Sequence, residues 1–463
     1  MKRTKNLPAD PQDRRFTAPW ERVFNKILTP FEEFIHNQTT GSIILMVCAV
    51  LALLLANSGW AAAYQAFIET PLSISIGSYT LAKSLHYWVN EGLMTLFFFV
   101  MGLEIKRAIL VGELASPRLA ALPIIAALGG MIVPALLYIA INVGHDTLRG
   151  WGIPMATDIA FAVGVMVLLG PRIPKSLVMF LVALAIVDDL GAVLVIAVFY
   201  TDHIVFSSLA VAALLLSLLI VLNFGGIRHP LPYFLVTVAL WFMLLDSGIH
   251  ATIAGVLSAF AIPARPKYEP LRFSAHVRSL IDRFEAGSRR DKDILANDEQ
   301  NAIARALEES AKMVRAPLQR LEHAFHLPVM LLVIPIFALT NAGVAIDADI
   351  FTAAFSHPLT LGIVAGLVAG KFIGIAGICW LALKLGIGQL PEHTQFRHIA
   401  GVGLLGGIGF TMSLFIAELG FTSAEHLAMA KLGILTASVI AGVVGYGWLL
   451  LAARAPRGQS SGA

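Results

Sequence analysis

Long apolar runs, each of about 20 residues, recur along this chain and constrain its fold more than any other feature. Hydrophobic residues make up 57% of the sequence and charged residues only 14%, which excludes an ordinary water-soluble domain. An α-helix needs about 20 apolar residues to cross a hydrocarbon layer ~30 Å thick. We therefore predict an all-α polytopic membrane protein with about 12 transmembrane helices. The predicted spans are 42–63, 84–103, 120–142, 151–169, 176–200, 204–223, 231–246, 249–262, 327–346, 359–383, 397–419 and 424–453.

Lysine and arginine residues lie in alternate loops between these spans. By the positive-inside rule such loops face the cytoplasm, so both termini are expected there and the number of spans is even. The chain then divides into a cytoplasmic N-terminal segment 1–41, spans 1–8 in 42–263, a charged cytoplasmic insertion 264–320, spans 9–12 in 321–455 and a cytoplasmic tail 456–463. The basic loop positions are Lys106, Arg107, Arg118, Arg172, Lys175, Arg228 and Arg397, with Lys83 and Arg149 as exceptions in the opposite loops.

The insertion 264–320 is polar and mixed in charge, so it is not a span. We expect a solvated linker with one exposed helix at 299–315. A regulatory or docking role for it stays open.

Residues 72–81 alternate between apolar and polar side chains around Gly77–Ser78. This period predicts a small external β-hairpin in the first external loop. An exposed hairpin edge can pair with a second copy, so we expect a homodimer through 72–81.

Ionisable residues interrupt several of the apolar runs. Asp188 and Asp189 stand side by side in one run, Asp158 lies in the preceding one, and Lys371 lies in a later one. Each ionised residue at the centre of a bilayer costs roughly 2.5–3.5 kcal/mol, so four cost about 10 kcal/mol, comparable to the whole stability of a domain. These side chains are therefore expected to face a polar cavity and to carry the function.

Helix-breaking residues interrupt the fourth and eleventh predicted spans. Pro154 precedes Asp158 in the fourth, and several glycines between Gly401 and Gly409 loosen the eleventh. Unwound backbone at membrane depth is tolerated only where protein or a water-filled cavity surrounds it, and paired interrupted spans are typical of transporter sites. In the tenth span, glycines recur every four residues and predict a close helix crossing beside Lys371; they are Gly362, Gly366, Gly370 and Gly374.

Other classes of site have little support in the sequence. Cys48 and Cys379 both fall inside spans without any metal-ligand spacing, so we expect inert thiols. No basic patch for nucleic acid is present, and no cofactor motif is found.

Five segments of the chain are similar to those of one transporter family, the bacterial NhaA sodium/proton antiporters. The segments are Met155–Phe161, Ala185–Ala192, Ser247–Thr252, Phe337–Val344 and Gly406–Ser413, and the similarity extends over nearly all of 35–455 apart from 264–316. The resemblance implies inverted-topology repeats in which spans 4 and 11 are broken and cross. It implies a secondary active Na⁺(Li⁺)/H⁺ antiporter of the bacterial inner membrane. Such a protein is pH-regulated, electrogenic with about two protons per Na⁺, and not an enzyme.

The resemblance also assigns roles to the charged residues of the spans. Asp188 and Asp189 become the pair that binds Na⁺ or Li⁺ and accepts protons, and Lys371 becomes the cationic partner of Asp188. Asp158 and Thr157 are placed at the helix crossing, and with Lys371 they complete the set of residues that bind the ion or protons. Carboxylate and hydroxyl oxygens suit a hard cation such as Na⁺, which agrees with these roles.

A pH-sensing region is implied by the same resemblance. Its candidates are Glu104, Arg107, His250 and Glu322. The family commonly has a second acid where this chain has Ala108, so the activating pH is left open.

Three other classes of membrane protein also place acidic residues inside the bilayer. An intramembrane aspartyl protease would use two buried acids but needs a Gly-x-Gly-Asp signature, which is absent. A cation channel or a Na⁺-coupled symporter of an organic solute could also use acids at the bilayer centre. The nearby positive charge of Lys371 disfavours a simple cation pore.

Overall fold

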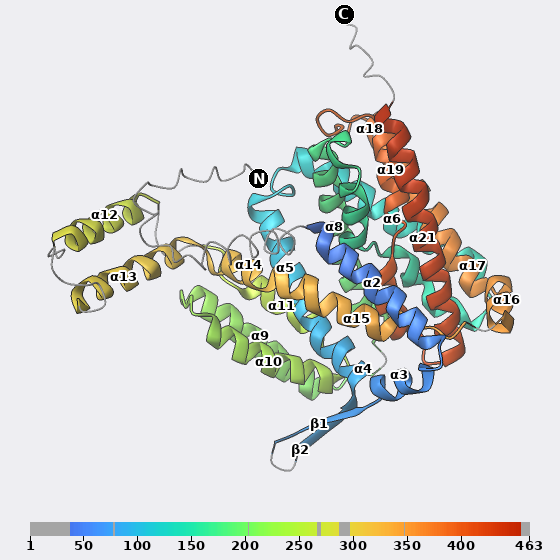
Figure 1. The fold of residues 1–463 in the computed structure, drawn as a ribbon, viewed down its shortest axis with the longest axis horizontal. Helices are drawn as coiled ribbons and strands as arrows, with labels where there is room; N and C mark the ends of the chain where they lie inside the picture. Colours follow the sequence, from blue (N-terminus) through green and yellow to red (C-terminus); the bar gives the residue numbers. More distant parts are fainter. Residues whose placement is uncertain are drawn as a thin grey trace, which may run out of the picture.

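Helices form nearly all of the secondary structure of this chain in the computed structural model (Figure 1). The structure describes residues 38–76, 79–201, 203–265, 270–286, 297–346 and 348–454. The tail 456–463, most of the N-terminal segment 1–41 and the predicted turn Gly77–Ser78 lie outside the described residues.

Seven of the described helices are long and apolar enough to cross a membrane. Only helices satisfy every backbone polar group within one segment in a lipid environment, which explains their dominance. The seven are α6 (Pro117–Asn142), α8 (Lys175–Phe199), α9 (Phe206–Phe224), α10 (Pro230–Ser247), a helix made of α14 (Pro317–Pro328), η6 (Val329–Val333) and α15 (Ile334–Asn341), a helix made of α17 (Pro358–Ala365), η7 (Gly366–Gly370), η8 (Ile373–Gly377) and α18 (Ile378–Lys384), and α21 (Ala424–Arg454).

Three further candidates are pairs of helices that bend sharply at a short break, and counting each pair as one span gives up to ten spans in the described residues. The pairs are α2 (Gln38–Ala56) with α3 (Ala61–Ile68), bent by 117°, η3 (Asp146–Met155) with α7 (Ile159–Val167), bent by 42°, and α19 (Phe396–Leu405) with α20 (Phe410–Gly420), bent by 44°. The breaks predicted in the fourth and eleventh spans are therefore confirmed.

Two of the predicted spans contain no helix that is both long enough and apolar enough to cross a membrane on its own. The segment 84–103 forms α4 (Leu85–Tyr87), η2 (Trp88–Leu93) and α5 (Met94–Val111), and 249–262 forms α11 (Ile253–Ala261) of only 9 residues. These helices pack closely, because a Cβ atom on Gly255 would lie 2.4 Å from the backbone oxygen of Thr95. Up to ten of the about 12 predicted spans are thus supported.

The predicted first span is wrong in its last part, because the helix ends at Ala56 rather than continuing to 63. The Asn57 side chain donates hydrogen bonds to the carbonyl oxygens of Leu53 and Val344, at 2.8 and 2.7 Å. It thereby fixes the chain at the point where α2 turns into α3. A polar side chain that satisfies a helix end in this way stops the helix inside an apolar run.

The spanning helices fall into two sets. In one, α6 packs on η3, α8 and the helix α17–α18, while α21 packs on α17, α19 and α20; we call these helices, with α7, the site set. In the other, which we call the flanking set, α5 packs on α11 and α14, and α9 packs on α10; it also contains α2, η2 and α15. A separate apolar cluster holds much of the flanking set together, through Leu103, Leu219, Leu240 and Ala259.

Main chains approach closely where α6 crosses the tenth span. A Cβ atom on Gly374 would lie 2.2 Å from the carbonyl oxygen of Gly129, and one on Gly370 would lie 2.8 Å from the Cα atom of Pro134. Both distances are shorter than real Cβ contacts, so only glycine fits. The predicted close crossing beside Lys371 is confirmed.

Strands β1 (Pro71–Ile76) and β2 (Tyr79–Ser84) form the predicted antiparallel hairpin, with Pro71 opposite Ser84 and Ile76 opposite Tyr79. The indole nitrogen of Trp88 donates to the carbonyl oxygen of Leu72 at 3.1 Å and ties the hairpin to η2. The hairpin projects from the end of the bundle opposite to the C-terminal end of α21 (Figure 1). We call this the hairpin end.

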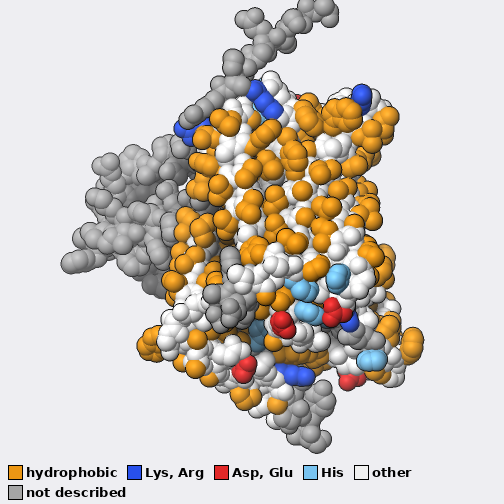
Figure 2. Space-filling view, turned by 90° about the vertical axis from the view of Figure 1, so that its right-hand side faces the viewer, with side chains coloured by type: hydrophobic (Ala, Val, Ile, Leu, Met, Phe, Trp, Pro, Cys, Tyr) orange, Lys and Arg blue, Asp and Glu red, His pale blue; other side chains and the backbone are white. Residues whose placement is uncertain are grey.

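The charged insertion contains two helices rather than one. Helix α13 (Asp298–Val314) confirms the predicted helix at 299–315, whereas α12 (Pro270–Ala286) was not predicted, and α14 already begins at Pro317. The two lie side by side away from the spanning helices (Figure 1), and Leu280 and Ile303 are buried. We call the end of the bundle where α14 begins the insertion end. Figure 2 shows one face of the bundle, hydrophobic over its middle, with histidine and acidic side chains toward one end.

Candidate functional site

The two adjacent acids lie near the middle of α8 and are almost fully buried, Asp188 at 1% and Asp189 at 2% exposure. Consecutive residues of a helix point about 100° apart, so the two carboxylates face different neighbours. The Lys371 Nζ atom donates to Asp188 Oδ2 at 2.7 Å, and both side chains have no exposed surface. The cation lies between the two π-helical turns η7 and η8, on the helix whose glycines contact α6. The predicted pairing of Lys371 with Asp188 is thus present.

One carboxylate oxygen of each acid is available for a further ligand. Asp188 Oδ1 and Asp189 Oδ1 are buried and have no hydrogen-bond partner among the described residues. An unsatisfied buried polar group costs roughly 1–3 kcal/mol, and more if it is charged. Asp189 lies within electrostatic reach of Asp158, Asp188 and Lys371. Two unsatisfied carboxylate oxygens in such a place are suited to hold a cation or protons.

The breaks of the two bent spans meet at Asp158. The Asp158 side chain caps α7 by accepting the backbone N–H of Phe161 at 2.9 Å, and it accepts the backbone N–H of Thr411, near the start of α20, at 3.1 Å. The Thr411 hydroxyl donates to the same carboxylate at 2.6 Å. A single carboxylate therefore lies at the positive N-terminal ends of two half-helices, where negative charge is stabilised.

Two carbonyl oxygens of the break between α19 and α20 are satisfied at the same place. The Thr157 hydroxyl donates to the carbonyl oxygen of Gly406, just after α19, at 2.9 Å. The backbone N–H of Asp158 donates to the carbonyl oxygen of Ile408 at 2.7 Å. The predicted contact between the broken spans is therefore present. The unwound backbone is satisfied by protein groups, as irregular structure at membrane depth requires.

Asp158 and Asp189 differ in whether their carboxylate oxygens already accept hydrogen bonds. Both carboxylate oxygens of Asp158 accept hydrogen bonds from α7 and α20, so this acid is already employed in holding the crossing. Asp189 Oδ1 accepts none from the described residues. Thr411 belongs to one of the segments singled out in the sequence, yet its role was missed, because a threonine in an apolar helix looks like a packing residue.

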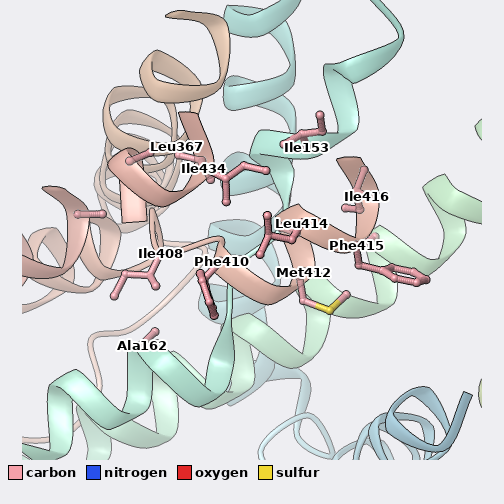
Figure 3. Close-up of a cluster of buried hydrophobic side chains, with 14 of the residues drawn as sticks. Ile153, Ala162, Leu367, Ile408, Phe410, Met412, Leu414, Phe415, Ile416 and Ile434 are labelled. Carbon is pink, nitrogen blue, oxygen red and sulfur yellow. The ribbon is translucent and has the colours of Figure 1, made fainter. Parts of the chain in front are cut away.

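Many buried apolar side chains pack around the crossing. Along α20 the side chains from Phe410 to Ala417 are all buried, so this half-helix has no face left for lipid. Figure 3 shows Ile408 and Phe410 flanking the break, with Leu367 of the tenth span close by. A helix that is apolar and buried all round lies in the interior of the bundle. The acids are thus enclosed in the interior of the bundle.

The pH-response candidates separate into two groups. At the insertion end, Arg107 forms an ion pair with Glu322 at 2.5 Å, and Glu104 contacts His326 Nδ1 at 3.1 Å. Both contacts join α5 to α14. The sequence had indicated three of these residues, whereas His326 was missed.

His250 lies at the hairpin end instead. Its Nε2 atom is 3.0 Å from the carbonyl oxygen of Tyr200, and its Nδ1 atom is 3.4 Å from Glu91 Oε1. Glu91 and Glu104 are on one continuous stretch of helix, roughly 20 Å apart along its axis. The four candidates therefore do not form one cluster. Glu91 was missed because an acid near the start of a span reads as an interfacial charge.

A further polar cluster at the hairpin end was not foreseen. His86 Nε2 lies 2.9 Å from Asn341 Oδ1 and 3.5 Å from Glu418 Oε1, and Asn90 Nδ2 lies 3.3 Å from the same nitrogen. The Lys431 Nζ atom is 2.6 Å from Glu418 Oε1. Asn90, Asn341 and Lys431 are buried, whereas the Glu418 side chain is 9% exposed and the His86 side chain 28% exposed. Glu418 and Lys431 stand near span ends in the sequence, where nothing reveals that they pair.

Both cysteines, Cys48 and Cys379, are free thiols. Within the described ranges, no group of three or more His, Cys, Asp or Glu side chains is arranged to hold a resident metal ion.

Comparison with known proteins gives consistent matches along the chain. A family model described as Na⁺/H⁺ antiporter 1 matches residues 32–449. A protein of Saccharophagus degradans named Na(+)/H(+) antiporter NhaA 1 is 54% identical over 440 residues, which cover 95% of each chain. Proteins named Na(+)/H(+) antiporter NhaA from Sulfurimonas denitrificans and Acidithiobacillus ferrooxidans are 52% and 49% identical, covering 94% and 92% of this chain and 98% of each relative.

Proposed function

This chain belongs to the NhaA family of Na⁺/H⁺ antiporters, and we propose that it expels Na⁺ or Li⁺ from the cell in exchange for about two protons. Its relatives are named as antiporters, which supports the function of a transporter rather than that of an enzyme. One observation carries the proposal. It is the buried acid pair on α8, in which one oxygen atom of each acid has no hydrogen-bond partner among the described residues.

Asp189 and Asp188 bind the transported ion in this proposal. Na⁺ contacts the unsatisfied oxygens of the ionised acids, and protons bind to the same oxygens, so the two compete. Lys371 compensates Asp188 when the ion is absent. Asp158 and Thr157 hold the crossing at which the half-helices meet and set the position of α20 beside the acids.

Exchange follows from this competition without any further catalyst. A site that faces one side of the membrane at a time releases Na⁺ where protons are abundant and releases protons where they are scarce. Two titrating groups per Na⁺ make the exchange electrogenic, so the membrane potential also drives it. The similar bends of η3–α7 and α19–α20, 42° and 44°, support the inverted-topology relation between the two halves.

The orientation proposed from the basic loops puts the hairpin end outside the cytoplasm. The insertion end, with Arg107 and the helices α12 and α13, then faces the cytoplasm of a bacterial inner membrane. The hairpin extends beyond the spans, and its free edge supports a homodimer through 72–81. The surrounding partner is the lipid bilayer.

We assign pH regulation to the contacts of α5. The pairs Glu104–His326 and Arg107–Glu322 connect α5 to α14 at the cytoplasmic end, while His250 contacts Glu91 at the other end. Histidine changes its charge between pH 5 and 8, so the two contacts that His326 and His250 make change strength in the physiological range. Ala108 supplies no further acid here, and the set-point is therefore this chain's own.

Everted membrane vesicles or proteoliposomes test the proposal. Added Na⁺ or Li⁺ should collapse an imposed pH gradient, whereas added K⁺ is the comparison cation. Because protons and Na⁺ share the carboxylates, the apparent Na⁺ constant should rise by roughly tenfold per pH unit of acidification for one competing proton. Ion flux without proton counterflow would indicate a channel, and uptake that requires an organic solute would indicate a symporter. An Na⁺ affinity that does not change with pH would contradict the shared site.

A further inference from the structure

Every described side chain of the proposed ion site comes from the site set. Asp158 caps the N-terminus of α7, and Asp188, Asp189, Lys371 and Thr411 lie on α8, the tenth span and α20. The hairpin-end cluster is divided differently. Glu418 on α20 and Lys431 on α21 belong to the site set, whereas His86, Asn90 and Asn341 belong to the flanking set and its connection to the hairpin.

Glu418 is mechanically connected to the ion site. It follows Thr411 by seven residues on the same half-helix, which is about two turns or roughly 10 Å. Thr411 holds Asp158 through both its hydroxyl and its backbone N–H. A movement of α20 that displaces the crossing therefore also displaces Glu418 and changes the distance between Glu418 and His86.

Alternating access requires the site set to move against the flanking set, because the ions must reach the acids from either side. Side-chain contacts that join the two sets at the hairpin end include His86 with Glu418 and His250 with the Tyr200 carbonyl oxygen. On the basis of the proposed transport function, we propose that His86 and Glu418 form a proton-operated latch, which keeps the hairpin end of the site closed when the external medium is acidic.

The surroundings of His86 are built for a change of charge. Its Nε2 atom faces two oxygen acceptors, Asn341 Oδ1 at 2.9 Å and Glu418 Oε1 at 3.5 Å. Asn90 is the polar neighbour on the same stretch of helix, and Lys431 already neutralises Glu418 from α21. A proton on His86 adds an attraction across the two sets, and its loss removes that attraction. Since 28% of the His86 side chain is exposed, external protons reach it.

The latch also gives a buried ionic group a purpose. An ion pair taken out of water contributes little to stability, because desolvation offsets the attraction, so such pairs are better suited to switching between conformations. The Glu418 carboxylate is such a group, because it contacts both the permanent cation Lys431 and the titratable His86. Glu418 stays compensated by Lys431 in both states, and only the link to the flanking set depends on pH.

Exchange of labelled Na⁺ against Na⁺ in proteoliposomes tests the latch. Protein oriented with the hairpin end outward is studied at saturating Na⁺ on both sides, with the internal pH fixed and the external pH set to 8 or 6. The variants are His86→Gln, which removes the charge, and His86→Lys, which makes it permanent. The matched control is His203→Gln, an exposed histidine of another loop at the same end.

Wild-type exchange should slow by about fivefold on external acidification beyond any slowing in His86→Gln, the size expected for a partly exposed pair. His86→Lys should be slow at both pH values, whereas His203→Gln should behave like the wild type. A role of His86 in packing alone would affect the Gln and Lys variants alike at pH 8, which would overturn the latch. Adding Glu418→Gln should restore the rate of His86→Lys.

Two kinds of failure are distinguishable. A wild-type protein that moves no Na⁺ contradicts the proposed transport function itself. Normal Na⁺ exchange with the same response to external pH in the wild type, His86→Gln and His86→Lys contradicts the latch alone. Thermal melting of each purified variant shows whether a low rate reflects loss of fold.

Discussion

Replacing Lys371 by methionine should destabilise the fold, and more strongly at high pH. The Lys371–Asp188 pair is completely buried, with 2.7 Å between Nζ and Oδ2. Removing one partner of a buried pair costs about 3–5 kcal/mol, because the other charge is left without compensation. Methionine keeps most of the volume, so little of this cost comes from a cavity.

The pH dependence follows from the remaining acid. Without Lys371, Asp188 is tolerated in the fold only with its proton, whereas an aspartate in the unfolded chain is ionised above about pH 4. Folding must therefore take up a proton, and stability falls as the pH rises, by about 1.4 kcal/mol per unit. Between pH 6 and 8 the Lys371→Met variant should lose up to about 2.7 kcal/mol relative to the wild type.

Thermal and denaturant unfolding of purified protein at pH 6, 7 and 8 measures this effect. Lys384→Met is the matched control, since Lys384 is an exposed residue near the end of the same span that lies over the Trp380 ring. The double variant Lys371→Met with Asp188→Asn should regain most of the stability and lose the pH dependence. A single variant that is equally destabilised at all three pH values would refute the electrostatic reasoning.

Three further predictions concern the ion site and the hairpin. Asp189→Asn should abolish Na⁺-dependent proton movement in vesicles while the melting curve stays close to that of the wild type, because shape is kept and one oxygen ligand and its charge are lost; wild-type exchange in this variant would exclude the site. Thr411→Val should cost about 1.5–3 kcal/mol in denaturant unfolding, since it removes a hydrogen bond to the buried Asp158, whereas Thr201→Val, at a partly buried hydroxyl bonded to a carbonyl oxygen, should cost less. Deleting about residues 73–79 should weaken dimers in sedimentation experiments yet leave exchange measurable; well-folded monomers without transport would show that assembly and transport are not separable.

The functional importance of the charged residues inside the spans could be predicted from the sequence. Ionised side chains are costly inside a membrane, and nothing in the fold requires them there. Asp188, Asp189 and Lys371 each interrupt an apolar run, and Pro154 marks the break of a span. Such a pattern does not indicate the direction in which each side chain points. The sequence places Asp158 at the helix crossing, but it does not indicate that its oxygens accept hydrogen bonds from α7 and α20.

The missed features depend on contacts between distant parts of the chain. His86, Asn341 and Glu418 come from three separate helices, and each one alone resembles an ordinary interfacial residue. The end of α2 is another case, because Asn57 stops the helix through a carbonyl oxygen that belongs to Val344. The short helix α11 was expected to be longer, since its hydropathy continues beyond the residues that are helical.

The main-chain contact between Gly129 and Gly374 limits which amino acids can be accommodated near the site. A side chain at either position would meet backbone atoms of the other helix, so the two helices could accept it only by moving apart. Lys371 lies one turn before Gly374, and such a separation would draw its amino group away from Asp188. Gly129 and Gly374 contact no ion, yet both should tolerate almost no substitution. Random mutagenesis followed by selection for growth on sodium should recover few or no substitutions at either position.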